Sequence, residues 1–76
     1  MKDSILNWES IVHKNVRSSD NENAGNVIEI EDDTITVIHG TKVEFVIPKD
    51  HVGGFDGAEV RLDLPYSKLG QYVKRT

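Results

Sequence analysis

The chain has 76 residues, with 9 Lys and Arg against 13 Asp and Glu, which gives a net charge of −4. It has no Cys, which excludes a disulfide framework and a thiolate metal site. No apolar run approaches the roughly 18 residues of a membrane span, and the first residues show no secretory signal, so we expect a cytoplasmic location. A chain this short builds one core. We therefore expect a single domain over residues 1–76, with its body approximately over 8–64 and a C-terminal segment with a basic tail over 65–76.

The first third of the chain predicts a short helical start followed by a strand and a polar loop. Ile5, Trp8 and Ile11 recur at roughly helical spacing over residues 1–11. Residues 12–18 predict a first strand with Val16 on its inner face. Residues 19–25 are turn-forming, and Gly25 supplies a backbone conformation that residues with a Cβ avoid.

Three strands follow in quick succession. Residues 26–31 predict a strand with Ile28 and Ile30 pointing inward and the glutamates between them pointing outward. A tight turn at residues 32–33 leads to strands over 34–39 and 42–47.

The connection at Gly40-Thr41 leaves the register of this hairpin open. A two-residue turn pairs Ile38 with Val43 and leaves an apolar patch that requires a covering element or a second subunit. A three-residue connection exchanges the faces, because a one-residue slip reverses every side chain. It gives one apolar face and leaves the threonines outside, and we favour it; that face holds Ile35, Val37, Val43, Phe45 and Ile47.

The remaining segments alternate between turns and one clear strand. Pro48 ends the hairpin, and residues 48–55 predict a turn or a single helical turn with Val52 and Phe55 directed at the core. Residues 58–64 alternate apolar and charged side chains without exception and predict a strand. Pro65 begins a further helical turn, on which Tyr66, Leu69 and Val73 share a face. These elements predict a mainly β fold, a small antiparallel β-barrel of five to six short strands with helical turns near the N-terminus, after Pro48 and after Pro65.

The charged residues are unevenly distributed. Residues 18–33 hold six acids and no Lys or Arg, whereas residues 65–76 hold three bases and no acid. A solvated acidic edge and a basic tail explain this pattern simply, and pairing of the acidic edge with a partner's basic tail is the alternative. Direct binding to nucleic acid is not expected of an acidic chain without a basic, aromatic-bearing strip.

No residue pattern predicts a catalytic, cofactor or metal site. His13, His39 and His51 are not spaced as zinc ligands usually are, and the loop from Asp20 to Gly25 only partly matches a calcium-binding loop. The serines have no nucleophile-elbow context, and the glycines form no phosphate-binding motif. We therefore expect a non-enzymatic protein without a cofactor. The candidate protein-interaction surface is aromatic and apolar, and it consists of Trp8, Tyr66, Leu69 and Tyr72.

Two sets of residues recur in a characteristic order. The first is Lys14, Val16, Asp20, Gly25 and Val27, and the second runs from the Ile47-Pro48 pair through Val52 to Val60 and Leu62. In this order they resemble the PRC-barrel domain. The chain departs from the pattern at His13, where the family commonly has Gly, and in a longer first loop. The resemblance implies a small barrel that docks to other macromolecules as an adaptor or assembly module, and it implies no catalytic residue.

These observations predict an adaptor or protein-interaction module of the PRC-barrel type that binds other proteins, and they leave open whether it also forms a homodimer. One alternative is a factor associated with ribosomes or RNA processing that acts through a protein contact, as the ribosome maturation factor of this barrel type suggests. A second alternative is a metal or small-ligand module that uses the histidines or the acidic loop.

Overall fold

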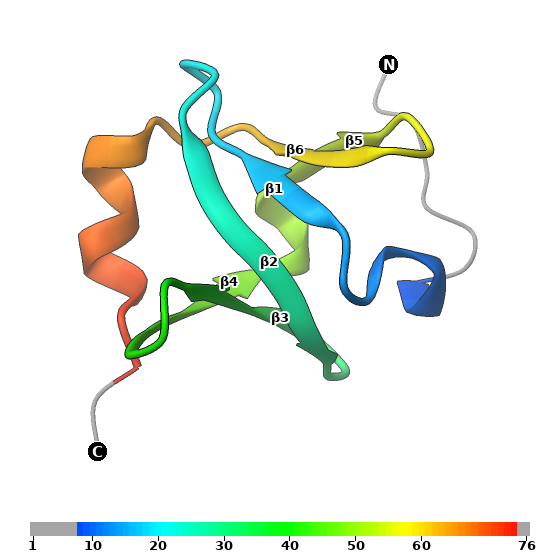
Figure 1. The fold of residues 1–76 in the computed structure, drawn as a ribbon, viewed down its shortest axis with the longest axis horizontal. Coiled ribbons are helices and arrows are strands. Elements are labelled where there is room, and N and C mark those ends of the chain that lie inside the picture. The colour runs from blue at the N-terminus through cyan, green and yellow to red at the C-terminus, as the bar shows by residue number, and fades with distance from the viewer. Residues whose placement is uncertain (1–7, 75–76) are drawn as a thin grey trace.

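The computed structural model describes residues 8–74, and Figure 1 shows its fold. Six short strands and three 3₁₀ helices make up this part of the chain. In order they are η1 (Trp8–Ile11), β1 (Asn15–Arg17), β2 (Asn23–Ile30), β3 (Thr34–His39), β4 (Val43–Pro48), η2 (Lys49–His51), β5 (Val52–Phe55), β6 (Glu59–Leu62) and η3 (Tyr66–Tyr72). The mainly β prediction is confirmed, as are the helical turns after Pro48 and Pro65. Of the helical start predicted over residues 1–11, the structure shows η1, and residues 1–7 lie outside the described part.

The six strands form one sheet in the order β4-β3-β2-β1-β6-β5. Four of the five pairings are antiparallel, but β1 and β6 run parallel, with Asn15 beside Glu59 and Val16 beside Val60. The sheet is therefore mixed, and the expectation of a purely antiparallel one is wrong. The edge strands β4 and β5 follow each other along the chain through η2 but do not pair, so the sheet of the described residues is curved rather than closed.

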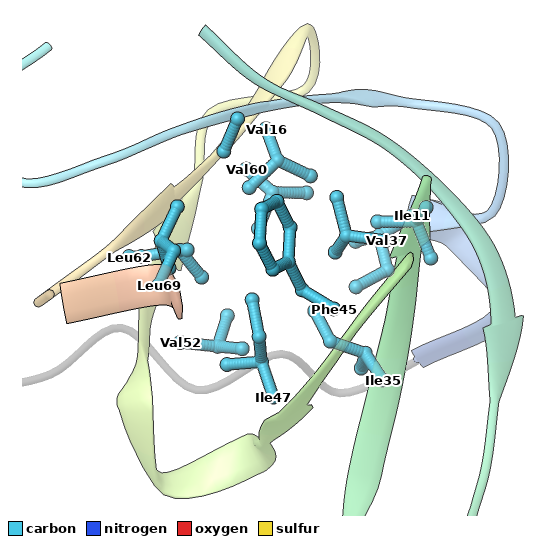
Figure 2. Close-up of a cluster of buried hydrophobic side chains, with 12 residues drawn as sticks. Ile11, Val16, Ile35, Val37, Phe45, Ile47, Val52, Val60, Leu62 and Leu69 are labelled. Carbon is cyan, nitrogen blue, oxygen red and sulfur yellow. The ribbon is translucent and has the colours of Figure 1, made fainter. Parts of the chain in front are cut away.

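The core lies on the inner face of this curved sheet. Side chains from η1, from the strands and from η3 converge there, as Figure 2 shows for ten of them. Leu69 of η3 is completely buried among them, so η3 covers the core from the side that the sheet leaves open. The fully apolar lining explains why these short elements hold together, because burial of each Val, Leu or Ile side chain contributes roughly 1.5–3 kcal/mol.

The β3–β4 hairpin adopts the register with a three-residue connection. His39 pairs with Val43, Val37 with Phe45 and Ile35 with Ile47. All four residues of the last two pairs are buried, as the favoured register predicts. Val43 stands at the exposed end of the hairpin, with 38% of its surface accessible. Thr36 alternates along β3 with the inward-facing Ile35 and Val37, but it is buried rather than exposed, with only 6% of its surface accessible.

Strand β2 departs from the predicted inward and outward pattern. A bulge between Val27 and Glu29 adds one residue to this strand opposite β3. Val27, before the bulge, is buried, whereas Ile28, the extra residue, is 38% exposed. The prediction that Ile28 points inward is therefore wrong, because the extra residue shifts the alternation by one position.

Two backbone positions explain why β1 is shorter and β2 longer than predicted. His13 has φ 71°, so the chain turns there and β1 begins only at Asn15. Gly25 has φ 119° but lies inside β2, where it faces Val16 of β1. An added Cβ at Gly25 would stand 2.1 Å from the carbonyl oxygen of Ile38, so β3 passes too close for any side chain. Gly25 has the predicted conformation, but it allows two strands to approach rather than closing a loop.

Candidate protein-interaction surface

The four residues predicted to form one interaction surface lie in two separate places. Tyr66, Leu69 and Tyr72 are on η3, and Trp8 is on η1 across the molecule (Figure 1). Leu69 is 0% exposed, so it belongs to the core and does not lie at the surface. Trp8 is half-buried against the core, and its ring lies under the ammonium group of Lys49, 4.7 Å from Nζ to the ring centroid.

The two tyrosines of η3 each contact a histidine, and the two histidines belong to different elements, β3 and η2. The Tyr66 hydroxyl lies 3.3 Å from Nε2 of His39, at the end of β3, and the rings meet edge to face. The Tyr72 ring lies 6.0 Å from the ring of His51, which belongs to η2. Nδ1 of His51 also lies 2.9 Å from a carboxylate oxygen of Asp63. These contacts hold η3 over the open side of the sheet. Their first role is therefore structural.

The three histidines do not meet. His13 is exposed in the turn before β1, and the other two are separated by the length of η3. Within residues 8–74, no three His, Asp or Glu side chains are grouped as metal ligands would be. In the loop before β2, Asp20 accepts hydrogen bonds from the Ser18 hydroxyl and from the backbone N–H of Tyr66. This loop therefore fastens the first hairpin to the start of η3.

The two edges of the sheet differ in whether another part of the described chain pairs with them. The outer edge of β4 receives the end of the described chain, since Val73 bridges to Phe45 and the Lys74 N–H donates to the Glu44 carbonyl oxygen at 2.7 Å. The outer edge of β5 has no pairing strand among residues 8–74. An unpaired edge exposes backbone donors and acceptors to which another chain can bind.

A shallow hollow lies along the β5–β6 hairpin beside this free edge. It is lined by Gly53, Gly54, Phe55, Asp56, Glu59 and Arg61. Strand β5 itself has the sequence Val-Gly-Gly-Phe, without the Pro or charged residue that commonly protects an edge strand. We define this free edge and the residues lining the hollow as the β5 edge site.

The two carboxylates of the β5 edge site are already engaged within the molecule. Glu59 accepts hydrogen bonds from Arg17 Nε at 3.0 Å and from Asn15 Nδ2 at 2.9 Å, and these bonds lower its pKa. Asp56 accepts from the backbone N–H groups of Glu59 and Ala58, which lowers the pKa of its carboxyl group. Both side chains are therefore ionised at neutral pH; Glu59 joins β6 to β1, and Asp56 stabilises the β5–β6 turn.

Arg61 is the charged group of the site that remains available. It is exposed on the outer face of β6, between the buried Val60 and Leu62. Within the described residues its guanidinium makes no hydrogen bond or ion pair, and its charge acts on Asp56 only at a distance. The β5 edge site therefore offers a free strand edge with one available positive charge.

Sequence reasoning missed this site because it missed β5. Val52 and Phe55 stand three residues apart and both contact the core, which matches helical spacing. In the structure they lie on a strand, and a bulge between Val52 and Gly54 supplies the extra residue. Two glycines have low strand propensity, so nothing local in this segment indicates a strand.

No family model, curated protein or solved structure matches the chain. Among residues 8–74, no helix is both long enough and apolar enough to cross a membrane.

Proposed function

We propose that this chain is a non-enzymatic protein-interaction module that binds partner proteins at the β5 edge site. The observation that supports this function is that, within the described chain, one sheet edge is covered and the other is not. The chain covers the β4 edge with Val73 and Lys74, and it leaves the β5 edge without a strand among residues 8–74. An exposed sheet edge with a hollow beside it can bind an extended segment of another chain.

The resemblance to the PRC-barrel domain favours the same kind of function. At His13, where that pattern commonly has Gly, the chain adopts φ 71°, a conformation that Gly favours. His13 therefore differs from Gly in residue type but adopts a backbone conformation of the kind that Gly provides. An adaptor role is what this resemblance implies.

Site-specific photo-crosslinking in cells tests the proposal. A photoreactive phenylalanine analogue replaces Ala58, which is exposed in the β5–β6 turn, and in a control it replaces Lys42, which is exposed in the β3–β4 turn. We expect discrete protein adducts from position 58 and not from position 42. Each adduct is identified by mass spectrometry and must bind the purified chain by calorimetry. The absence of adducts at position 58, or identical adducts at both positions, would refute the proposal.

Sedimentation equilibrium of the purified chain determines whether a second copy is one of these partners. A concentration-dependent rise in mass that a bulky substitution at Ala58 abolishes would assign self-association to the same site.

A further inference from the structure

The hydrogen bonds at the two ends of β5 determine which of its backbone groups face the free edge. The Asp56 N–H donates to the Glu59 carbonyl, and the Asp63 N–H donates to the His51 carbonyl. In an antiparallel pair, residues alternately direct their backbone groups toward and away from the partner strand. Phe55 precedes Asp56 and Val52 follows His51. The backbone groups of Phe55 and Val52 therefore face away from β6.

Three backbone groups at this edge consequently have no partner among residues 8–74. The Val52 N–H is occupied, because it donates to the Lys49 carbonyl. The Val52 carbonyl and both the N–H and the carbonyl of Phe55 remain. One donor flanked by acceptors is what an added strand of three or four residues requires.

The register places Arg61 where it can contact such an added strand. Arg61 pairs with Gly54 across the β5–β6 ladder, and Gly54 has no side chain to stand between the guanidinium and the free edge. An added strand would lie two strand spacings, about 10 Å, from β6. An arginine and a carboxylate side chain of the added strand can meet over that distance. The nearby Glu59 and Asp56 carboxylates do not neutralise Arg61 by direct contact, because they are bound elsewhere.

A second copy of this chain fits the β5 edge site less well. Two β5 strands of four residues would bury far less than the roughly 1,200–2,000 Å² of a stable interface. Such a pair would also bring two copies of Arg61 to one face and supply them only with carboxylates that are already engaged. A linear acidic segment of another protein needs less area and supplies the missing charge.

We infer, on the basis of the proposed function, that the β5 edge accepts an extended segment of a partner protein as an added strand. We further infer that Arg61 selects a segment with an Asp or Glu on its outer face. Backbone hydrogen bonds supply the general affinity, and the carboxylate supplies the preference.

The test is an NMR titration of the full ¹⁵N-labelled chain with synthetic peptides. The probe is the capped peptide Ac-TVEVTV-NH₂, and its matched controls replace the central Glu with Gln or Lys. We expect chemical-shift changes over residues 52–55 and slower hydrogen exchange at the Phe55 amide. The Glu peptide should bind about two- to five-fold more tightly than the Gln peptide, the range that exposed ion pairs give. The Lys peptide should bind more weakly still.

Variants of Arg61 separate the charge from the strand pairing. Arg61→Gln should bind the Glu and Gln peptides equally and retain the affinity of the wild-type chain for the Gln peptide. Arg61→Lys should keep part of the preference. Equal affinity of the wild-type chain for all three peptides would overturn the charge selection but leave the proposed function standing, provided that position 58 still crosslinks.

Two results would overturn the strand addition itself. One is that no peptide shifts residues 52–55, or that the shifts occur at β4 instead. The other is a Phe55 amide that is already protected in the free protein. That protection would show that another part of the chain or a second copy pairs with β5.

Discussion

At the scale of single residues, β3 approaches Gly25 so closely that no side chain fits there. We expect Gly25→Ala to lower the free energy of unfolding by about 2 kcal/mol or more, because the new Cβ would collide with the backbone at Ile38 and the residue would be strained at φ 119°. Urea unfolding at equilibrium measures the loss. Gly70→Ala is the matched control, since nothing lies within 4 Å of its added Cβ.

The control should leave the free energy of unfolding unchanged or raise it by up to about 1 kcal/mol, because alanine restricts the unfolded chain more than glycine does. Equal unfolding midpoints for the two variants would mean that β2 and β3 can separate at Gly25 without cost. The sequence predicts the special conformation of Gly25 correctly. It does not predict the close contact with Ile38, which depends on a strand pairing formed 13 residues later.

At the scale of elements, Asp20 joins the loop before β2 to the first residue of η3. Hydrogen bonds from Ser18 and from the Tyr66 N–H favour the ionised carboxylate and hold its pKa below the ordinary value of 3.8. A group whose pKa is lowered by folding stabilises the folded state above its ordinary pKa, and this contribution is lost as the pH falls through the lowered value. Glu59 and Asp56 act in the same direction.

We therefore expect the thermal stability of the chain to be constant near neutral pH and to fall as the pH drops below the ordinary values of 4.5 for Glu and 3.8 for Asp. Asp20→Asn should lower the melting temperature at neutral pH and make the fall in acid shallower. Asp32→Asn is the control, because that exposed carboxylate receives no hydrogen bond from residues 8–74. Melting curves by circular dichroism at a series of pH values measure both effects. An acid limb that is the same in both variants would contradict the role of Asp20.

The sequence predicts elements well where strict alternation is unbroken. In β6 the inward positions Val60 and Leu62 are buried as predicted, and the hairpin register follows from the apolar face that it creates. Prediction from the sequence fails at the bulges of β2 and β5. One extra residue there shifts the alternation of inward and outward side chains, and no local sequence pattern marks the shift. The β5 edge site depends on such a bulge and on a free edge, and both are properties of the assembled sheet.

At the scale of the whole molecule, the sheet has two ends and the described chain covers one of them. The parallel pairing of β1 with β6 joins the two halves of the sheet, and it leaves β4 and β5 as edges. Among residues 8–74, the backbone contacts that cover the β4 edge are the bridge at Val73 and the hydrogen bond at Lys74. If this covering is what prevents nonspecific pairing, its removal should have consequences beyond stability.

Replacing Lys74 with Pro tests this directly, because proline removes the N–H that donates to Glu44 at 2.7 Å. We expect Lys74→Pro to lose about 1 kcal/mol of stability, the typical worth of one hydrogen bond. It should also self-associate with rising concentration in sedimentation velocity, because the β4 edge becomes available. Lys74→Ala keeps the backbone donor and removes only the side chain, whose ammonium lies 3.9 Å from the Glu44 carboxylate. The alanine variant should behave as the wild-type chain does. Equal association of the two variants would show that the backbone bond does not protect β4.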